Sequence, residues 1–156
     1  MSQTGTKAIC SKGDGTVWYF LIQKLQNVNP AYSETRFLSS LDPKEIPEHA
    51  FIITAYNPMD EKLPGRENQK QNTILEAIIK QDGAHCLPII GTSKDLVHQE
   101  PSFLTDLHKT KVIELAKQFN QRAIFEIKRD TLTIIYTDEK NSTIVLGSFQ
   151  DRWITT

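Results

Sequence analysis

Glu100 and Ser102 are the residues of this sequence whose types and spacing are best suited to chemistry. In an extended chain, residues two positions apart share one face, so the carboxylate and the hydroxyl lie side by side while Pro101 and Phe103 share the other face. Glu100 would then act as a general acid or base, or accept hydrogen bonds from a ribose-like diol, with Ser102 as a donor. The structural alternative is that Ser102 or Thr105 prepares the helix that follows, and the sequence alone favours it.

Polar residues also occur where a packed domain would prefer apolar ones. Tyr56 and Asn57 end an apolar run that is predicted to be a buried strand, and Asn68 and Asn72 continue the apolar face of the next helix because they are four residues apart. Ligands of open α/β units bind at the carboxyl ends of strands, and a helix N-terminus suits an anion. These four residues are therefore predicted to contact a ligand. The alternative, that the asparagines bond to loop backbone as buried amides most often do, is preferred for Asn68 and Asn72.

Gln121 is the third candidate, because it lies between a predicted helix end and a predicted strand. Its amide would bind a ligand or cap the helix, and the structural role is preferred. The chain has no glycine-rich phosphate loop, no His-Glu-x-x-His, no Cys-x-x-Cys and no nucleophile elbow. Its four histidines show no ligand spacing, so neither a metal nor a cofactor is predicted.

The elements that must position these residues are predicted from hydrophobic periodicity. Three helices are expected, over Val17–Gln26, Glu67–Gln81 and Leu107–Phe119. Strands are expected over Thr35–Leu41 (an edge strand), Phe51–Tyr56, His85–Ile90, Glu100–Leu104, Arg122–Ile127, Thr131–Tyr136 and Thr143–Leu146, with Trp153 anchoring the tail. The segment from Phe51 to Ile90 is predicted to be a parallel β-α-β unit with a right-handed crossover, and the later strands to be antiparallel. The fold class is therefore α+β, a mixed sheet packed with about three helices.

Composition narrows the classes of function. The 156 residues are predicted to form a flexible arm over 1–15 and a single domain over 16–156. A net charge of −1 argues against a nucleic-acid partner, because phosphate binding needs clustered cations. The N-terminus lacks a secretory leader and no apolar run is long enough to span a bilayer, so a cytoplasmic location without membrane association is expected. The two cysteines, Cys10 and Cys86, do not form a disulfide framework.

Several short motifs, taken in order, resemble a bacterial family known as domain of unknown function 3293. They are Thr54-Ala55-Tyr56-Asn57-Pro58, Glu67-Asn68 with Asn72 and Leu75, Pro88-Ile89-Ile90-Gly91, Glu100-Pro101-Ser102-Phe103 and Phe119–Phe125, with a weaker match at Tyr32 and Thr35. The resemblance covers about 31–127. This chain has Asn120 where the family usually has glycine, and Arg122 where it usually has asparagine, which puts a polar role for Arg122 in doubt. The family implies no activity.

The sequence leads to two hypotheses of function. The first is a small-molecule-binding domain, with or without enzymatic activity, for a nucleotide or sugar-phosphate-like ligand. Asn57 and Asn68 would orient the ligand by hydrogen bonds. Glu100 would be the acid/base residue or would accept hydrogen bonds from ligand hydroxyls. Ser102 and Gln121 would donate hydrogen bonds to the ligand. The second is a non-catalytic interaction or regulatory module whose polar cluster is structural. The sequence does not decide between them, nor does it give the oligomeric state.

Overall fold

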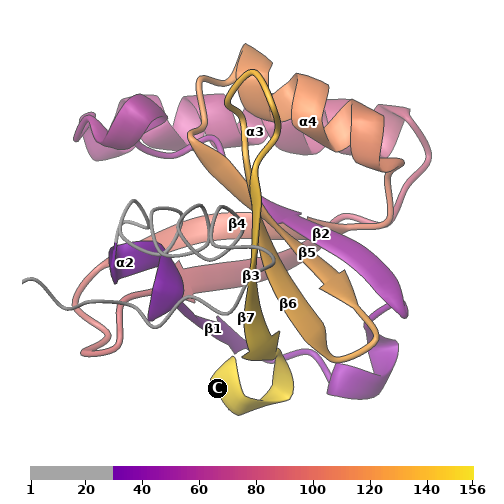
Figure 1. The fold of residues 1–156 in the computed structure, drawn as a ribbon. Helices are drawn as coiled ribbons and strands as arrows, with labels where there is room; N and C mark the ends of the chain where they lie inside the picture. Colours follow the sequence, from indigo (N-terminus) through magenta and orange to yellow (C-terminus); the bar gives the residue numbers. More distant parts are fainter. Residues whose placement is uncertain (1–29) are drawn as a thin grey trace, which may run out of the picture. The chain divides into compact units, whose positions relative to one another are not determined.

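The computed structural model describes residues 30–156, of which Ala31–Thr156 form one compact unit (Figure 1). The predicted arm over 1–15, the predicted helix over 17–26 and Cys10 lie outside the described residues. The helices are α2 (Pro30–Ser33), α3 (Gly65–Gln81) and α4 (Lys109–Gln118), with 3-10 turns η1 (Pro43–Glu45), η2 (Pro58–Asp60) and η3 (Gln150–Arg152). The strands are β1 (Arg36–Ser39), β2 (His49–Ile53), β3 (Leu87–Thr92), β4 (Gln99–Thr105), β5 (Ala123–Lys128), β6 (Thr131–Tyr136), β7 (Thr143–Ser148) and β8 (Trp153–Thr155).

All eight described strands belong to one mixed sheet in the order β7-β6-β5-β2-β4-β3-β1-β8. One neighbouring pair, β1 with β8, is parallel and the others are antiparallel. With α2, α3 and α4 this is the α+β class with about three helices that the sequence predicts. Helices α3 and α4 lie together on one face of the sheet (Figure 1).

β2 shows why a central strand of this fold is a continuous apolar run. Phe51 and Ile53 pack in the core under α3 and α4. Ala50 and Ile52 alternate with them and pack in a second core on the opposite face, which also contains Phe37. Because successive side chains of a strand point to opposite faces, both sets are buried and no polar residue interrupts the run.

Three predictions of topology need correction. β2 and β3 run in the same direction but are not neighbours, because β4 lies between them and pairs antiparallel with each. The reason is the short turn from Ser93 to His98, closed by a bond from the Ser93 N–H to the His98 carbonyl of 3.0 Å, which folds β4 back against β3. β1 is not an edge strand, since β8, which contains Trp153, pairs with its outer side. Gly91 does not end β3 but lies within it, opposite Glu100.

The predicted inward face of α3 is confirmed: Asn68, Asn72, Leu75 and Ile79 are its buried residues. Among residues 30–156, no helix combines the length and the hydropathy needed to cross a bilayer.

Candidate functional site

The strand order brings the sequence-predicted residues to one edge of the sheet. β4 and β5 both pair antiparallel with β2, so their first residues lie at the end of the sheet where β2 finishes. Tyr56 and Asn57 follow β2, Glu100 is near the start of β4, and Gln121 precedes β5. The first turns of α3 bring Asn68 and Asn72 to the same place, as their hydrogen bonds show.

The Asn72 side chain bridges the backbones of β2 and β4 beside Pro101. The β2–β4 register, in which Ile53 faces Phe103, places Ala55 opposite Pro101 when continued by two residues. Pro101 has no N–H, so the ladder cannot continue there. The Asn72 side chain accepts from the Ala55 N–H at 3.0 Å and donates to the Pro101 carbonyl at 3.0 Å. Asn72 is 6% exposed, and both ends of its amide bond to backbone.

Asn68 holds Asn57 in place. The Asn57 N–H donates to Asn68 Oδ1 at 2.8 Å, and Asn68 Nδ2 donates back to Asn57 Oδ1 at 2.8 Å. The same Nδ2 also donates to the Leu63 carbonyl at 3.3 Å, and the Leu63 N–H donates to Asn57 Oδ1 at 3.3 Å. These bonds fix the Asn57 side chain so that its own Nδ2 is available to a further acceptor.

That acceptor is Glu100, to whose Oε1 the Asn57 Nδ2 donates at 2.8 Å. Burial raises the pKa of Glu100 above its ordinary value, and the nearby charge of Asp60 raises it further. The Asn57 hydrogen bond and His98 lower this pKa, with a smaller combined effect. Within residues 30–156, Glu100 forms no ion pair. The site therefore contains a half-buried carboxylate held by one neutral donor.

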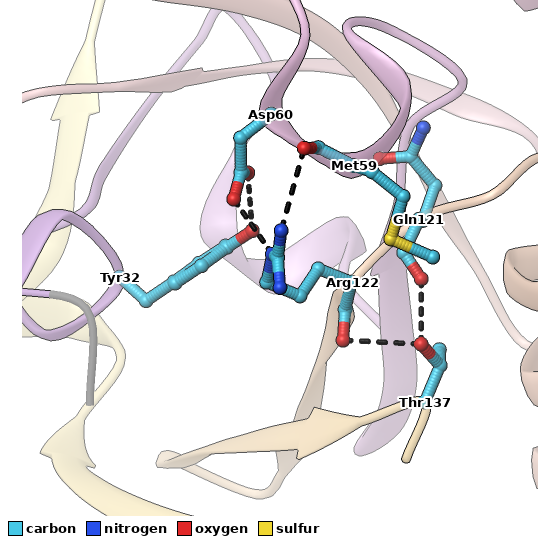
Figure 2. A network of polar contacts seen from close by, with 6 residues as sticks. All are labelled: Tyr32, Met59, Asp60, Gln121, Arg122 and Thr137. Carbon is cyan, nitrogen blue, oxygen red and sulfur yellow. Dashed lines mark hydrogen bonds and ion pairs between the residues drawn. The ribbon is translucent and has the colours of Figure 1, made fainter. Parts of the chain in front are cut away.

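Asp60 connects two further residues to this edge, as Figure 2 shows. The Tyr32 hydroxyl donates to Asp60 Oδ1 at 3.0 Å, and Arg122 Nε donates to Asp60 Oδ2 at 2.7 Å. Arg122 also donates through Nη2 to the Met59 carbonyl at 3.4 Å. Burial, followed by the charge of Asp60, raises the pKa of Tyr32 far above its ordinary value, so its hydroxyl remains a donor at physiological pH.

Sequence reasoning did not predict this second group. It named Tyr32 only as a weak family match, omitted Asp60, and doubted a polar role for Arg122. Tyr32 lies in α2, Asp60 in η2 and Arg122 directly before β5, and no local pattern joins them. The departure from the family pattern at Arg122 was the one available signal, because a charged residue there needs a partner.

The remaining predicted residues are near the site but bond elsewhere. Ser102 is buried, and its hydroxyl donates to the Glu100 backbone carbonyl at 3.0 Å rather than to the carboxylate. Gln121 is buried, and its Nε2 donates to the Tyr56 carbonyl at 3.0 Å and to the Phe119 carbonyl at 3.3 Å. Tyr56 thus contributes a backbone oxygen. Asn57, Asn68 and Glu100 are in direct side-chain contact; Asn72, Ser102 and Gln121 are not part of that chain of contacts.

The arrangement can accept hydrogen bonds and transfer a proton. Glu100 Oε2 has no hydrogen-bond partner among the described residues, and a carboxyl with a raised pKa can act as a general acid. No group of three metal-ligating side chains occurs within residues 30–156. The free thiol of Cys86 is a poor nucleophile, since burial raises its pKa to about 11.

Comparison with known proteins gives one match. Neither a curated protein nor a solved structure matches the chain. Residues 53–124 match the family model described as Protein of unknown function (DUF3293), which confirms the resemblance over a shorter span than expected and leaves Tyr32 outside it. The matched span contains every residue predicted to form the site. The resemblance of this chain to the DUF3293 family is therefore confirmed over residues 53–124.

Proposed function

We propose that this domain binds a small polar molecule at the carboxyl end of β2, with Glu100 as the residue that contacts it. The state of Glu100 carries the proposal: it is a half-buried carboxylate with a single hydrogen bond, from Asn57, and no ion pair among the described residues. Burying an acidic group is unfavourable unless partners compensate, and acidic residues are almost never buried unpaired. A ligand that donates to the free carboxylate oxygen would supply the missing partner.

The ligand class proposed is a nucleotide or sugar phosphate, in which a diol would donate to Glu100. A neutral hydroxyl suits this position better than an anion, because Asp60 adds a second negative charge beside it. A phosphate would therefore lie on the Arg122 side, where the guanidinium is half exposed. If the domain is an enzyme, Glu100 would transfer the proton, and its raised pKa brings it closer to the operating range of a general acid.

The proposal is tested by screening hydroxylated and phosphorylated metabolites for a rise in melting temperature. The substitution Glu100→Gln keeps the acceptor for Asn57 and removes the charge, so it should abolish the response to a hit. Glu114→Gln, on the exposed side of α4, is the matched control and should respond as the wild type does. Equal binding by the Glu100→Gln protein would remove Glu100 from the site.

A second candidate function is a non-catalytic interaction or regulatory module. The observation in its favour is that Asn68, Asn72 and Gln121 all bond to backbone, so much of the cluster has a structural role. In this case Asn57→Ala and Asn68→Ala should each destabilise the fold by about 1–3 kcal/mol. No small molecule should then raise the melting temperature of the wild type.

The setting proposed is the cytoplasm of a bacterium. The net charge of −1 supports a small molecule over a nucleic acid as ligand, and the low cysteine content fits a reducing compartment.

A further inference from the structure

The loop from Asn57 to Asp60 has an unusual backbone. Asn57, Met59 and Asp60 have φ values of 46°, 51° and 64°, in the left-handed region that disfavours residues with a side chain. Asn57 also precedes Pro58, and a residue before proline is disfavoured in helical conformations. Three such residues in a stretch of four require neighbours that hold them, and strain of this kind gathers at ligand clamps and switches.

Asn68 and Leu63 hold the Asn57 end of the loop, and the contacts that hold its Met59–Asp60 end come from Asn120, Arg122 and Tyr32. The Met59 N–H donates to the Asn120 carbonyl at 2.8 Å, and the Met59 carbonyl accepts from Arg122 at 3.4 Å. The two carboxylate oxygens of Asp60 are taken separately, one by Tyr32 and one by Arg122 (Figure 2). Tyr32 is itself fixed by ring contacts, 6.4 Å from Phe125 and 6.2 Å from Tyr136 between centroids.

Both ends of this loop act on Glu100. At one end, the Asn57 amide makes the hydrogen bond to the carboxylate. At the other, Asp60 places a second negative charge near it. The conformation of the loop therefore determines the environment of Glu100.

We propose that residues 57–60 form a strained loop latched by Tyr32 and Arg122 through Asp60, and that opening of the latch withdraws Asn57 from Glu100 and switches the site between two states. The latched state presents a carboxylate oriented by Asn57. The open state relaxes the left-handed residues and leaves Glu100 without its donor. The role of Glu100 rests on the proposed function, whereas the latch itself rests on the contacts of the loop.

Native-state hydrogen exchange tests the latch in the full chain without any ligand. Tyr32→Phe removes the donor to Asp60, and Tyr136→Phe is the matched control because the buried Tyr136 hydroxyl has no hydrogen-bond partner among residues 30–156. In Tyr32→Phe the exchange of the Met59 and Asp60 amides should speed up by about fivefold, the equivalent of one hydrogen bond. Exchange in β2 should stay unchanged, which shows that the variant is folded.

Met59→Gly should stabilise the latched loop, whereas Tyr32→Phe destabilises it, because glycine adopts the left-handed conformation without strain. Loop exchange should slow relative to Met59→Ala. In Tyr32→Phe the pKa of Glu100, followed by carboxyl carbon shifts, should rise, because the Asn57 hydrogen bond that lowers it is weakened and its effect is larger than that of the Asp60 charge, which raises it. Equal exchange and equal Glu100 titration in Tyr32→Phe and Tyr136→Phe would overturn the proposal. Because no ligand is used, this outcome is independent of whether Glu100→Gln abolishes binding.

Discussion

Replacing Asn72 by alanine removes the amide that joins the end of β2 to β4 at the point where Pro101 interrupts the ladder. The Pro101 carbonyl keeps a second donor, the Thr54 hydroxyl at 2.8 Å, but the Ala55 N–H is left buried without a partner. An orphaned N–H costs about 1–3 kcal/mol and the lost bond to Pro101 about 1 kcal/mol, so Asn72→Ala should lower the free energy of unfolding by about 2–4 kcal/mol.

The measurement is urea unfolding of Asn72→Ala beside Gln69→Ala, which truncates an exposed amide one turn earlier on α3. The control should change the free energy of unfolding by less than about 0.5 kcal/mol. An Asn72→Ala protein as stable as Gln69→Ala would refute the idea that this amide completes the sheet.

Three further predictions concern charge and backbone conformation. Since burial raises the pKa of Glu100, the stability that this group contributes is present below its unfolded pKa and lost as pH rises through the folded one. Glu100→Gln should therefore gain stability relative to the wild type as pH rises from the unfolded pKa of glutamate through the higher folded one, and parallel urea-melt profiles would contradict this. Asn120→Gly should stabilise by about 0.5 kcal/mol, because φ is 52° there, and a lower melting temperature would argue against it. Arg152→Ala removes donors to three backbone carbonyls at 2.6–3.3 Å and should cost about 2–3 kcal/mol in chemical unfolding, against almost nothing for exposed Lys117→Ala.

The parts of the structure that sequence predicts are those with local signals. The apolar run of β2 predicts a strand buried on both faces, and the spacing of Asn68 and Asn72 predicts their inward direction on α3, because both depend only on side-chain periodicity. Asn57 and Glu100 are each singled out by the local sequence, but their meeting depends on the pairing of β2 with β4.

The parts that sequence misses depend on contacts between distant segments. The same strands allow two arrangements, one with β3 next to β2 and one with β4 between them, and no local signal selects the second, which is the one observed. The group around Asp60 contains Arg122, which is 62 positions from Asp60 in the sequence, and Tyr32, which is 28 positions from it. A left-handed conformation at Met59 is unpredictable from its residue type, because tertiary contacts impose it.

The most direct test of the ligand site is a two-dimensional amide NMR titration of the full chain with the metabolites that raise its melting temperature. The account predicts a saturable shift of the Asn57 side-chain amide, which lies 2.8 Å from Glu100. This shift should be lost in Glu100→Gln and kept in Glu114→Gln. If no compound moves the Asn57 resonance, or if Glu100→Gln shows the same shift as the wild type, the carboxyl end of β2 is not a ligand site.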